Sequence, residues 1–380
     1  MFFRVRLLLQ GSFALSAVLP ILFTPVHAQS GPANQGTPQR LYRSYGKKAS
    51  EVYKNIQVLQ DIDSTELIPT MQYMAESLGV GCDFCHVATG SDKDDKVMKV
   101  RARKMILMTR EINQNNFGAN KVVSCVVCHR GAASPILYAA IPEPGSGRAD
   151  VPAPSDRKLP SANQILDKYL QAVGGAAALQ RISTRVEKGT LISGDSKYPY
   201  EIYTKAPNKR AAITHQPDGE ALSVFNGTSG WLEITAPSPP GRDLTPSETA
   251  AAKVEADLRF ALDARQLLQG LNVLPPEKID GKEMYVVLGK PEGMRRVRLY
   301  FDEQSGLLTR VVRYSEVPLG FSPVQIDYAD YREVDGVKIP FRRTQSRPSG
   351  HSIVQIETVQ HNVPIDDAKF SKSSALQARQ

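Results

Sequence analysis

Two copies of the pentapeptide Cys-x-x-Cys-His contain the residues of this sequence best suited to chemistry. The first copy contains Cys82, Cys85 and His86, and the second contains Cys125, Cys128 and His129. Two thiols at this spacing can each form a thioether with a vinyl group of one porphyrin, and the adjacent histidine then becomes a ligand of its iron. All four cysteines belong to these motifs. The sequence therefore predicts two covalently attached haem c groups.

Two other chemistries use paired cysteines: a structural zinc site and a redox-active dithiol. Four thiolates can bind zinc tetrahedrally, but such a site does not require a histidine directly after both pairs. A thioredoxin-like dithiol is expected within a βαβ pattern, which the surrounding sequence lacks. Haem attachment is therefore the favoured interpretation.

Each haem iron needs a sixth ligand, and histidines are scarce. The histidines outside the two motifs and the first 28 residues all lie beyond residue 200. Methionine is the economical alternative, and Met/His ligation raises the reduction potential of a haem. Before the motifs lie the candidates Met71 for the first haem and Met105 for the second, with Met74 and Met108 as alternates one turn further on.

Helices are predicted before both motifs, and they would position these methionines. Residues 64–66 lie where a helix cap is expected, Met71, Met74 and Leu78 recur on one face, and Gly79 ends the helix. A second helix is predicted from about residue 95 to 113. Its expected apolar stripe consists of Met98, Ala102, Met105, Thr109 and Ile112. In each half, a turn then leads to Cys-x-x-Cys-His, which is expected to open another helix.

This region resembles the photosynthetic reaction-centre cytochrome c subunit family. The resemblance covers roughly residues 55–135 and is carried by MQYM at 71–74, LGVGCDFCH at 78–86, KVRARKMILMTREIN at 99–113 and VSCVVCHRG at 123–131. Members of the family are periplasmic cytochromes that pass electrons to an oxidised photosynthetic pigment. Their helix-borne methionines ligate haem, which agrees with Met71 and Met105 by position.

The sequence departs from the family pattern in two respects. A typical member carries four haem motifs, whereas this chain has two. One haem of the family takes a histidine from the segment just before the second motif, and residues 114–124 contain none. The resemblance implies a two-haem relative that exchanges electrons with redox partner proteins, for which a membrane reaction centre and a respiratory complex are the candidates.

The first 28 residues have the features of a secretory signal peptide. Arg4 and Arg6 precede an apolar run, and residues 26–28 offer small side chains for cleavage. Pro20 and Pro25 interrupt the run, which is short for a membrane span, although an uncleaved anchor is the alternative. Export suits haem attachment, which occurs outside the bacterial cytoplasmic membrane. The mature protein is expected in the periplasm, soluble or peripherally associated with the membrane.

Composition limits the remaining function classes. The chain has 380 residues, 41% of them hydrophobic, and a formal net charge of +8. This length favours two domains. No run of basic residues is interleaved with aromatics, so a nucleic-acid partner is not expected. A modestly basic surface would instead steer the protein toward an acidic redox partner or an anionic membrane.

The second half is predicted to form a separate, β-rich domain. The expected division is a signal peptide at 1–28, a flexible leader at 29–54, a di-haem domain at 55–140, a Pro-rich linker at 141–162 and a β-rich domain at 163–375. A helix before Gly174-Gly175 is followed by about ten strands, separated by turn signals such as Asp280-Gly281 and Asp335-Gly336. A helical insert is expected from Ser247 to Gln269.

The predicted fold is thus multidomain. An all-α di-haem cytochrome domain precedes an α+β domain in which an antiparallel curved sheet or half-barrel carries a packed helix. The second domain is similar to the outer-membrane lipoprotein carrier family, through residues 335–340 (DGVKIP) and 366–370 (DDAKF). That family holds acyl chains in a half-barrel, which implies a hydrophobic ligand here.

Three functions compete on this basis. Electron transfer without enzyme activity is favoured, because a protein ligand on both sides of each iron leaves no position for a substrate. A di-haem peroxidase would need one labile sixth ligand. A lipid-, lipoprotein- or quinone-binding module with a redox-sensing haem domain is the third. The second half contains no recognisable catalytic set.

Overall fold

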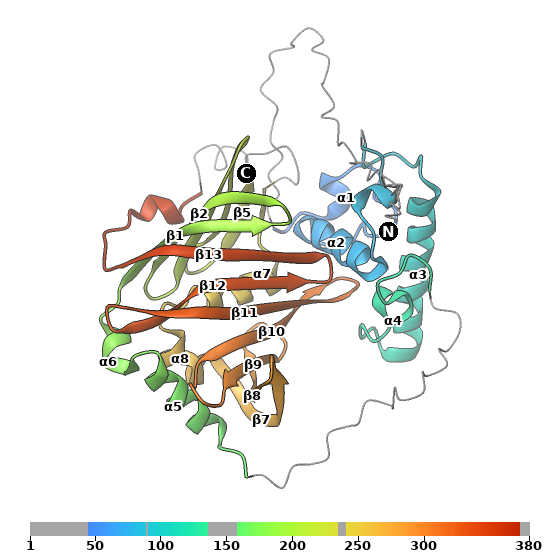
Figure 1. Ribbon diagram of the computed structural model, residues 1–380. Helices are drawn as coiled ribbons and strands as arrows, with labels where there is room; N and C mark the ends of the chain where they lie inside the picture. Colours follow the sequence, from blue (N-terminus) through green and yellow to red (C-terminus); the bar gives the residue numbers. More distant parts are fainter. Residues whose placement is uncertain (1–44, 89, 136–157, 235–240, 373–380) are drawn as a thin grey trace, which may run out of the picture. The chain divides into compact units, whose positions relative to one another are not determined.

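The computed structural model describes residues 45–88, 90–135, 158–234 and 241–372, all within one compact unit that spans Arg40–Gln380. The expected signal peptide and most of the expected linker lie outside the described residues. Within these ranges, no helix combines the length and apolar character needed to cross a bilayer. The described residues form a helical region followed by a large sheet, which confirms the predicted fold class (Figure 1).

The helical region is built from short elements around two longer helices. They are α1 (Ala49–Val52), η1 (Ser64–Glu66), α2 (Leu67–Leu78), η2 (Cys82–Phe84), α3 (Val97–Phe117) and α4 (Cys125–His129). Asp63 caps η1 by accepting a hydrogen bond from the Thr65 backbone N–H at 2.8 Å. Gly79 ends α2 with φ 66°, the left-handed conformation that glycine adopts at little cost.

Part of the expected leader is folded. Within residues 45–54, Ala49 is fully buried at the start of α1. Its N–H donates to the Ile62 carbonyl at 2.8 Å, and the Ser64 N–H donates to the Lys47 carbonyl at 2.7 Å. These bonds pair two segments on either side of α1, so the fold begins several residues before the predicted boundary.

The third helix differs from the prediction in its end and in its buried face. Helix α3 continues to Phe117, because Gly118 with φ 56° is the residue that can end it. Its buried residues are Ile106, Thr109 and Asn113. Of the predicted stripe only Thr109 is buried, and Met105 is 38% exposed. The Asn113 side chain accepts from the Val123 N–H at 2.9 Å and donates to its carbonyl at 2.6 Å, which ties α3 to the segment before the second motif.

In the described residues of the second domain, the strands form one antiparallel sheet of thirteen. They are β1 (Thr184–Ser193), β2 (Ser196–Lys205), β3 (Lys209–Gln216), β4 (Gly219–Phe225), β5 (Gly230–Ile234), β6 (Arg242–Asp243), β7 (Leu268–Ile279), β8 (Lys282–Pro291), β9 (Val297–Asp302), β10 (Leu308–Val317), β11 (Gly320–Val334), β12 (Val337–Arg347) and β13 (Gly350–His361). Every strand pairs with its neighbour in sequence, except that β1 pairs with β13 instead of β6 with β7. Two meanders are therefore joined through the first and last strands.

Helices cover one face of this sheet. They are α5 (Ala162–Ala172), α6 (Gly175–Gln180), α7 (Pro246–Glu255) and α8 (Phe260–Leu267), and a 3-10 turn, η3 (Asp367–Phe370), follows β13. Residues of all four helices share a buried cluster with strands from both meanders, including Leu166, Ala264 and Phe301. Figure 1 shows α7 and α8 behind the central strands. The domain core thus lies between the helices and the sheet.

Three details of the second domain correct the prediction. The expected insert at 247–269 is two helices, α7 and α8, and Gln269 already belongs to β7. Gly174-Gly175 ends α5 but also begins α6. Strands β3, β6 and β7 were not predicted. Strand β3 is buried on both faces at 211–214 and so shows no alternation, while β7 contains Pro275 and Pro276, which an edge strand tolerates.

A hairpin of the sheet packs against the helical region. Val317 and Leu319, at the tip between β10 and β11, belong to the buried cluster of α2 and α3, together with Tyr73. Gly320 lies so close to the Tyr73 ring that an added Cβ would collide with its hydroxyl. The Glu76 carboxylate accepts hydrogen bonds from Ser322 Oγ at 2.7 Å and from Ser349 Oγ at 2.9 Å.

Gly320→Ala tests this contact. We expect it to lower the free energy of unfolding by about 1–3 kcal/mol, because the new methyl group overpacks the site against a buried ring. In a Tyr73→Leu background the added penalty should be much smaller, as a double-mutant cycle measured by chemical denaturation will show. Equal penalties in both backgrounds would mean that Tyr73 is not the residue that the methyl group meets.

Candidate functional site

Helix α2 brings the two Cys-x-x-Cys-His motifs together. The first motif follows its end after three residues, in η2. The second motif forms α4, and behind it the Gly131 N–H donates to the Ser77 carbonyl near the end of α2 at 2.9 Å. The first motif forms only a 3-10 turn at residues 82–84, so the expectation that it opens a helix is wrong, whereas the second opens the five-residue α4.

The histidines of both motifs are held in the same way. His86 Nδ1 lies 3.0 Å from the Ser91 carbonyl oxygen, and His129 Nδ1 lies 3.0 Å from the Ala132 carbonyl oxygen. A carbonyl can only accept, so Nδ1 must carry the proton, and in the neutral ring the lone pair is on Nε2. Metal-binding histidines are oriented by such a bond on the other ring nitrogen. In both rings Nε2 is therefore the nitrogen that remains available to a metal.

The surroundings of His86 favour its neutral form. Burial lowers the pKa of His86, and the positive charges of Lys99, Arg103 and Lys96 lower it further, against the opposing effect of the Ser91 carbonyl. A neutral imidazole is the form that binds a metal. Burial also raises the pKa of the Cys85 and Cys125 thiols, so the free thiols are kept protonated.

Asp94 fixes the loop that carries Ser91. Its carboxylate pairs with Lys99 Nζ at 3.1 Å and with Arg103 at 2.9 Å. Hydrogen bonds from Arg103 and Lys99 hold the pKa of Asp94 well below its usual range. Lys99 Nζ also donates to the Ser91 carbonyl at 2.9 Å. The carbonyl that orients His86 is therefore itself positioned by a cation from α3.

Exposed apolar side chains are concentrated in the segment that contains α3 and the second motif. Of the eleven large apolar side chains that are exposed in the described residues, nine lie between residues 97 and 127. They are Val97, Val100, Met105, Leu107, Met108, Phe117, Val122, Val126 and Val127. Soluble proteins rarely expose such a concentration of apolar groups without a partner for it. A covalently held macrocycle next to Cys125 and Cys128 would cover groups of this kind.

The methionine candidates differ in their surroundings. Met71 and Met74 are half-buried and pack against the cluster that contains Tyr73, whereas Met105 and Met108 are 38% and 43% exposed. Met71 and Met105 remain the predicted sixth ligands, with the other two as alternates.

The four cysteines form no disulfide, and no group of three or more His, Cys, Asp or Glu side chains within the described ranges is placed to bind a metal ion. The two cysteine pairs do not converge as a single zinc site requires.

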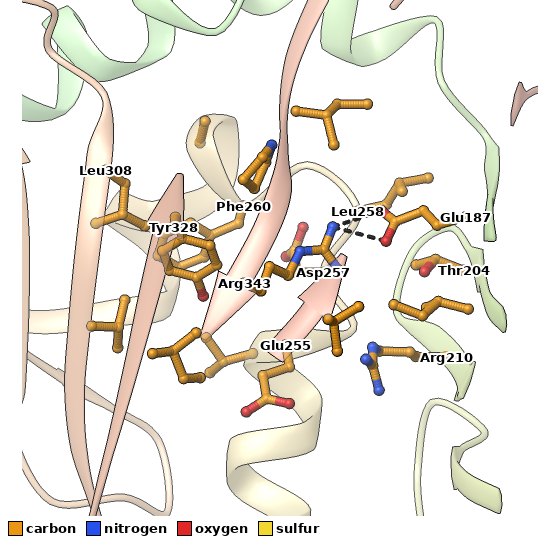
Figure 2. Close-up of a pocket in the computed structure, with 18 of the residues that line it drawn as sticks. Glu187, Thr204, Arg210, Glu255, Asp257, Leu258, Phe260, Leu308, Tyr328 and Arg343 are labelled. Carbon is orange, nitrogen blue, oxygen red and sulfur yellow. Dashed lines mark hydrogen bonds and ion pairs between the residues drawn. The ribbon is translucent and has the colours of Figure 1, made fainter. Parts of the chain in front are cut away.

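A second candidate site is a cavity of about 400 Å³ in the sheet domain. It lies between the helices and the strands, and its walls are mainly apolar. Figure 2 labels Phe260 of α8 and Leu258 of the loop before it, together with Leu308 and Tyr328 of the strands, among the side chains that line the cavity. This volume is within the usual range of about 300–1,000 Å³ for small-molecule pockets.

Charged residues also line this cavity, and most of them are paired. Glu187 lies 2.8 Å from Arg343 and 3.6 Å from Arg185, and its side chain is only 3% exposed. Burial opposes ionisation of Glu187, but the charges of Arg343 and Arg185 outweigh it and hold its pKa below the usual value. Arg313 pairs with Glu255 at 2.6 Å.

The sequence analysis did not predict the charged residues of the cavity. Their one signal was a pair of charges two residues apart, Arg185 and Glu187, which period-two alternation places on the same face of β1. The sequence alone did not say whether that face is the solvated or the buried one. Of the three remaining histidines, none lines the cavity: His215 is near Glu220 at 3.0 Å, His361 is near Asp335 at 3.0 Å, and His351 is exposed.

Comparison with known proteins shows that the helical region is similar to c-type cytochromes. Residues 24–153 match the family model described as photosynthetic reaction centre cytochrome C subunit. The photosynthetic reaction center cytochrome c subunit of Thermochromatium tepidum is 40% identical over 106 residues, 27% of this chain and 26% of the relative. Cytochrome c-554 of Chloroflexus aurantiacus is 34% identical over 85 residues, 20% of each. The resemblance expected from the motifs is confirmed, although the chain spans about a quarter or less of the length of these relatives.

Solved structures similar to the other part of the chain share little sequence with it. A LolA superfamily protein from Nitrosomonas europaea is 17% identical with a TM-score of 0.40, covering 56% of this chain and 99% of that protein. A DUF1329 family protein from Desulfovibrio piger is 13% identical with a TM-score of 0.39, covering 58% of this chain and 100% of that protein.

The cavity generates a prediction for the pH dependence of stability. Asp257 lines it between α7 and α8, and burial raises the pKa of Asp257 to about 6. The folded protein therefore binds this proton more tightly than the unfolded chain, whose carboxyl has a pKa of about 3.9. This contribution to stability is present below about pH 4 and is lost as the pH rises through about 6.

Asp257→Asn should raise the free energy of unfolding at pH 7 by on the order of 1 kcal/mol, after allowance for solvent screening. The amide oxygen can still accept from the Arg259 N–H, which the carboxylate binds at 2.8 Å. Denaturation from pH 4 to 8 should show the gain disappearing toward pH 4. Asp195→Asn, on the exposed β1–β2 turn, is the control. A gain that is the same at pH 4 and pH 7 would contradict the assignment.

Proposed function

We propose that this protein is a periplasmic di-haem c-type cytochrome that transfers electrons between redox proteins. The proposal rests on one shared feature of the two motif histidines. In each, Nδ1 lies 3.0 Å from a backbone carbonyl oxygen, which leaves Nε2 available to a metal. The similarity of the surrounding segment to reaction-centre cytochrome c subunits supports it.

Separate sets of residues would hold the two haem groups. The thioethers would form on Cys82 and Cys85 for one haem and on Cys125 and Cys128 for the other, and the iron would be held by His86 and Met71 in the first and by His129 and Met105 in the second. The haem iron supplies a reversible one-electron couple. The chain orients the ring of each histidine and carries exposed apolar side chains on α3 and α4 that a porphyrin would cover. Methionine ligation would raise the reduction potential.

This assignment favours electron transfer over enzyme activity. Two side-chain ligands for each iron would leave no position for a substrate, whereas a peroxidase needs one. Helix α2 contacts both motifs, through the turn at Gly79 and the bond from the Gly131 N–H to the Ser77 carbonyl. This arrangement would allow electrons to pass between two neighbouring haem sites.

The partner is proposed to be a protein with an acidic docking face. Arg101 and Lys104 are exposed on α3, and Lys93 is exposed on the preceding loop. Such a surface raises the rate of encounter with an acidic partner and makes that rate fall with salt. The candidates are a membrane reaction centre and a respiratory complex. The periplasmic location rests on the signal-like first 28 residues.

The haem count is the first test. Expressed as the full chain in a host that matures c-type cytochromes, the protein should exceed its polypeptide mass by two haem groups. Cys82→Ala with Cys85→Ala should remove one, and Cys125→Ala with Cys128→Ala should remove the other, because each pair forms the thioethers of one porphyrin. His351→Ala, outside both motifs, should keep both. A mass equal to that of the polypeptide alone, or bound zinc, would contradict the proposal.

The sixth ligands can be tested separately. Met71→Ala and Met105→Ala should each lower the reduction potential of one haem, on the order of 0.1 V within the roughly 0.8 V that axial ligands span. Each should also remove the methionine–iron charge-transfer band of one oxidised haem. Redox titration with optical spectra measures both effects. Met74→Ala and Met108→Ala are the matched controls, and a change in these variants instead would transfer the assignment to the alternates.

A further inference from the structure

We infer that Lys99 raises the reduction potential of the haem of the first motif above that of the second, so that electrons pass from the second haem to the first. Lys99 is a positioning residue in this account, because it acts through the backbone carbonyl that binds His86. The inference rests on the proposed electron transfer and adds a direction to it.

The ammonium group of Lys99 is held at three points. Its Nζ donates to the Ser91 carbonyl at 2.9 Å and to the Lys93 carbonyl at 2.7 Å, and it pairs with the Asp94 carboxylate at 3.1 Å. An ammonium group has three donors, so each of them has an acceptor here. The side chain is only 11% exposed. Lys99 is therefore fixed against the loop that follows the first motif.

The Ser91 carbonyl oxygen interacts with two donors, Lys99 and the Nδ1–H of His86 at 3.0 Å. A hydrogen bond from the ring to an acceptor makes a histidine a more basic ligand, which stabilises oxidised iron and lowers the potential. The charged second donor draws electron density from the same oxygen, so the oxygen is a weaker acceptor for His86. His86 is then a less basic ligand, and the potential of its haem rises.

The second motif lacks this second donor in the part of the chain that the structure describes. His129 Nδ1 lies 3.0 Å from the Ala132 carbonyl oxygen, and no other described residue donates to that oxygen. Both irons are assigned one histidine and one methionine, so the ligand types do not distinguish the two sites. The bond from Lys99 does distinguish them, and it favours the higher potential at the first.

Positive charge near the first motif acts in the same direction. The charges of Lys99, Arg103 and Lys96 lower the pKa of His86, which shows that they act on its ring. Asp94 is shared by Lys99 and Arg103, so one carboxylate offsets only part of this charge. The other carboxylates of the segment are exposed to water, which weakens their effect: Asp83, Asp92 and Asp95. Reduction removes one positive charge from a haem, so neighbouring cations favour the reduced form.

The experiment is a redox titration of the full-length, haem-loaded protein, followed by optical spectra. We expect two one-electron transitions. Cys82→Ala with Cys85→Ala should remove the transition at the higher potential, which assigns it to the first motif. Lys99→Gln should lower that transition alone. At a fixed potential the ratio of oxidised to reduced first haem should rise about tenfold, which corresponds to 59 mV for one electron.

Two further variants separate the role of Lys99 from a general loss of charge or structure. Lys99→Arg keeps the charge and a donor, and it should keep most of the parent potential. Lys54→Gln removes an exposed lysine from the same helical region and is the matched control, with both potentials unchanged. The methionine–iron charge-transfer band should persist in Lys99→Gln, because the sixth ligand is retained.

Several results would overturn the inference: loss of the lower transition in the cysteine variant, no shift in Lys99→Gln, or an equal shift in Lys54→Gln. A fall in Lys99→Arg as large as in Lys99→Gln would overturn the role of the charged donor. Loss of the methionine–iron band would mean that Lys99 acts only on the structure of the site. Two haems whose potentials do not depend on Lys99 would leave the proposed function intact, whereas a protein without haem would end both.

Discussion

The close approach between the end of α2 and the turn behind the second motif is the constraint on which the candidate haem sites depend. Gly79 adopts φ 66°, and a Cβ there would collide with the Gly131 carbonyl. Both requirements exclude other residues at this position. The same turn places Cys82 a short way beyond α2, with three residues between them, and the bond from the Gly131 N–H to the Ser77 carbonyl holds the turn after His129 near that helix. One glycine thus sets the position of both motifs.

The histidines then depend on backbone carbonyls, which no side-chain substitution removes. Ser91 and Ala132 both lie just after a motif, so each loop must return toward its own histidine. In the first loop, Lys99 donates a hydrogen bond to the Ser91 carbonyl and pairs with Asp94, and these contacts hold the loop near His86. An exposed ion pair contributes little to overall stability. Here its effect is local: it fixes the loop that determines which nitrogen of His86 is available to a metal.

The sequence predicted the parts of this protein whose signals are local. The spacing of Cys82, Cys85 and His86 identifies its chemistry without any fold, and Asp280-Gly281 and Asp335-Gly336 adopt the positive φ angles that such turns require. The missed strands lack a local signal: β3 is buried on both faces, and β7 follows α8 without a break. The buried face of α3 was predicted wrongly for a related reason. Met105 and Ile106 are both apolar, so the local sequence does not say which of them is buried. Ile106 is the buried one because it shares a cluster with Val317 and Leu319, which are distant in the sequence.

The cavity could not have been found from sequence, because its polar residues come from strands far apart in the chain. Glu187 on β1 meets Arg343 on β12 only because the first and last strands pair and close the two meanders on each other. Buried ion pairs are rarely the most stable solution for a core, since hydrophobic replacements of the same volume often do as well or better. The pair between Glu187 and Arg343 is therefore hard to explain by net stability alone. Its partners lie on β1 and β12, on either side of β13, so the pair favours the one strand order in which the two meanders join through the first and last strands.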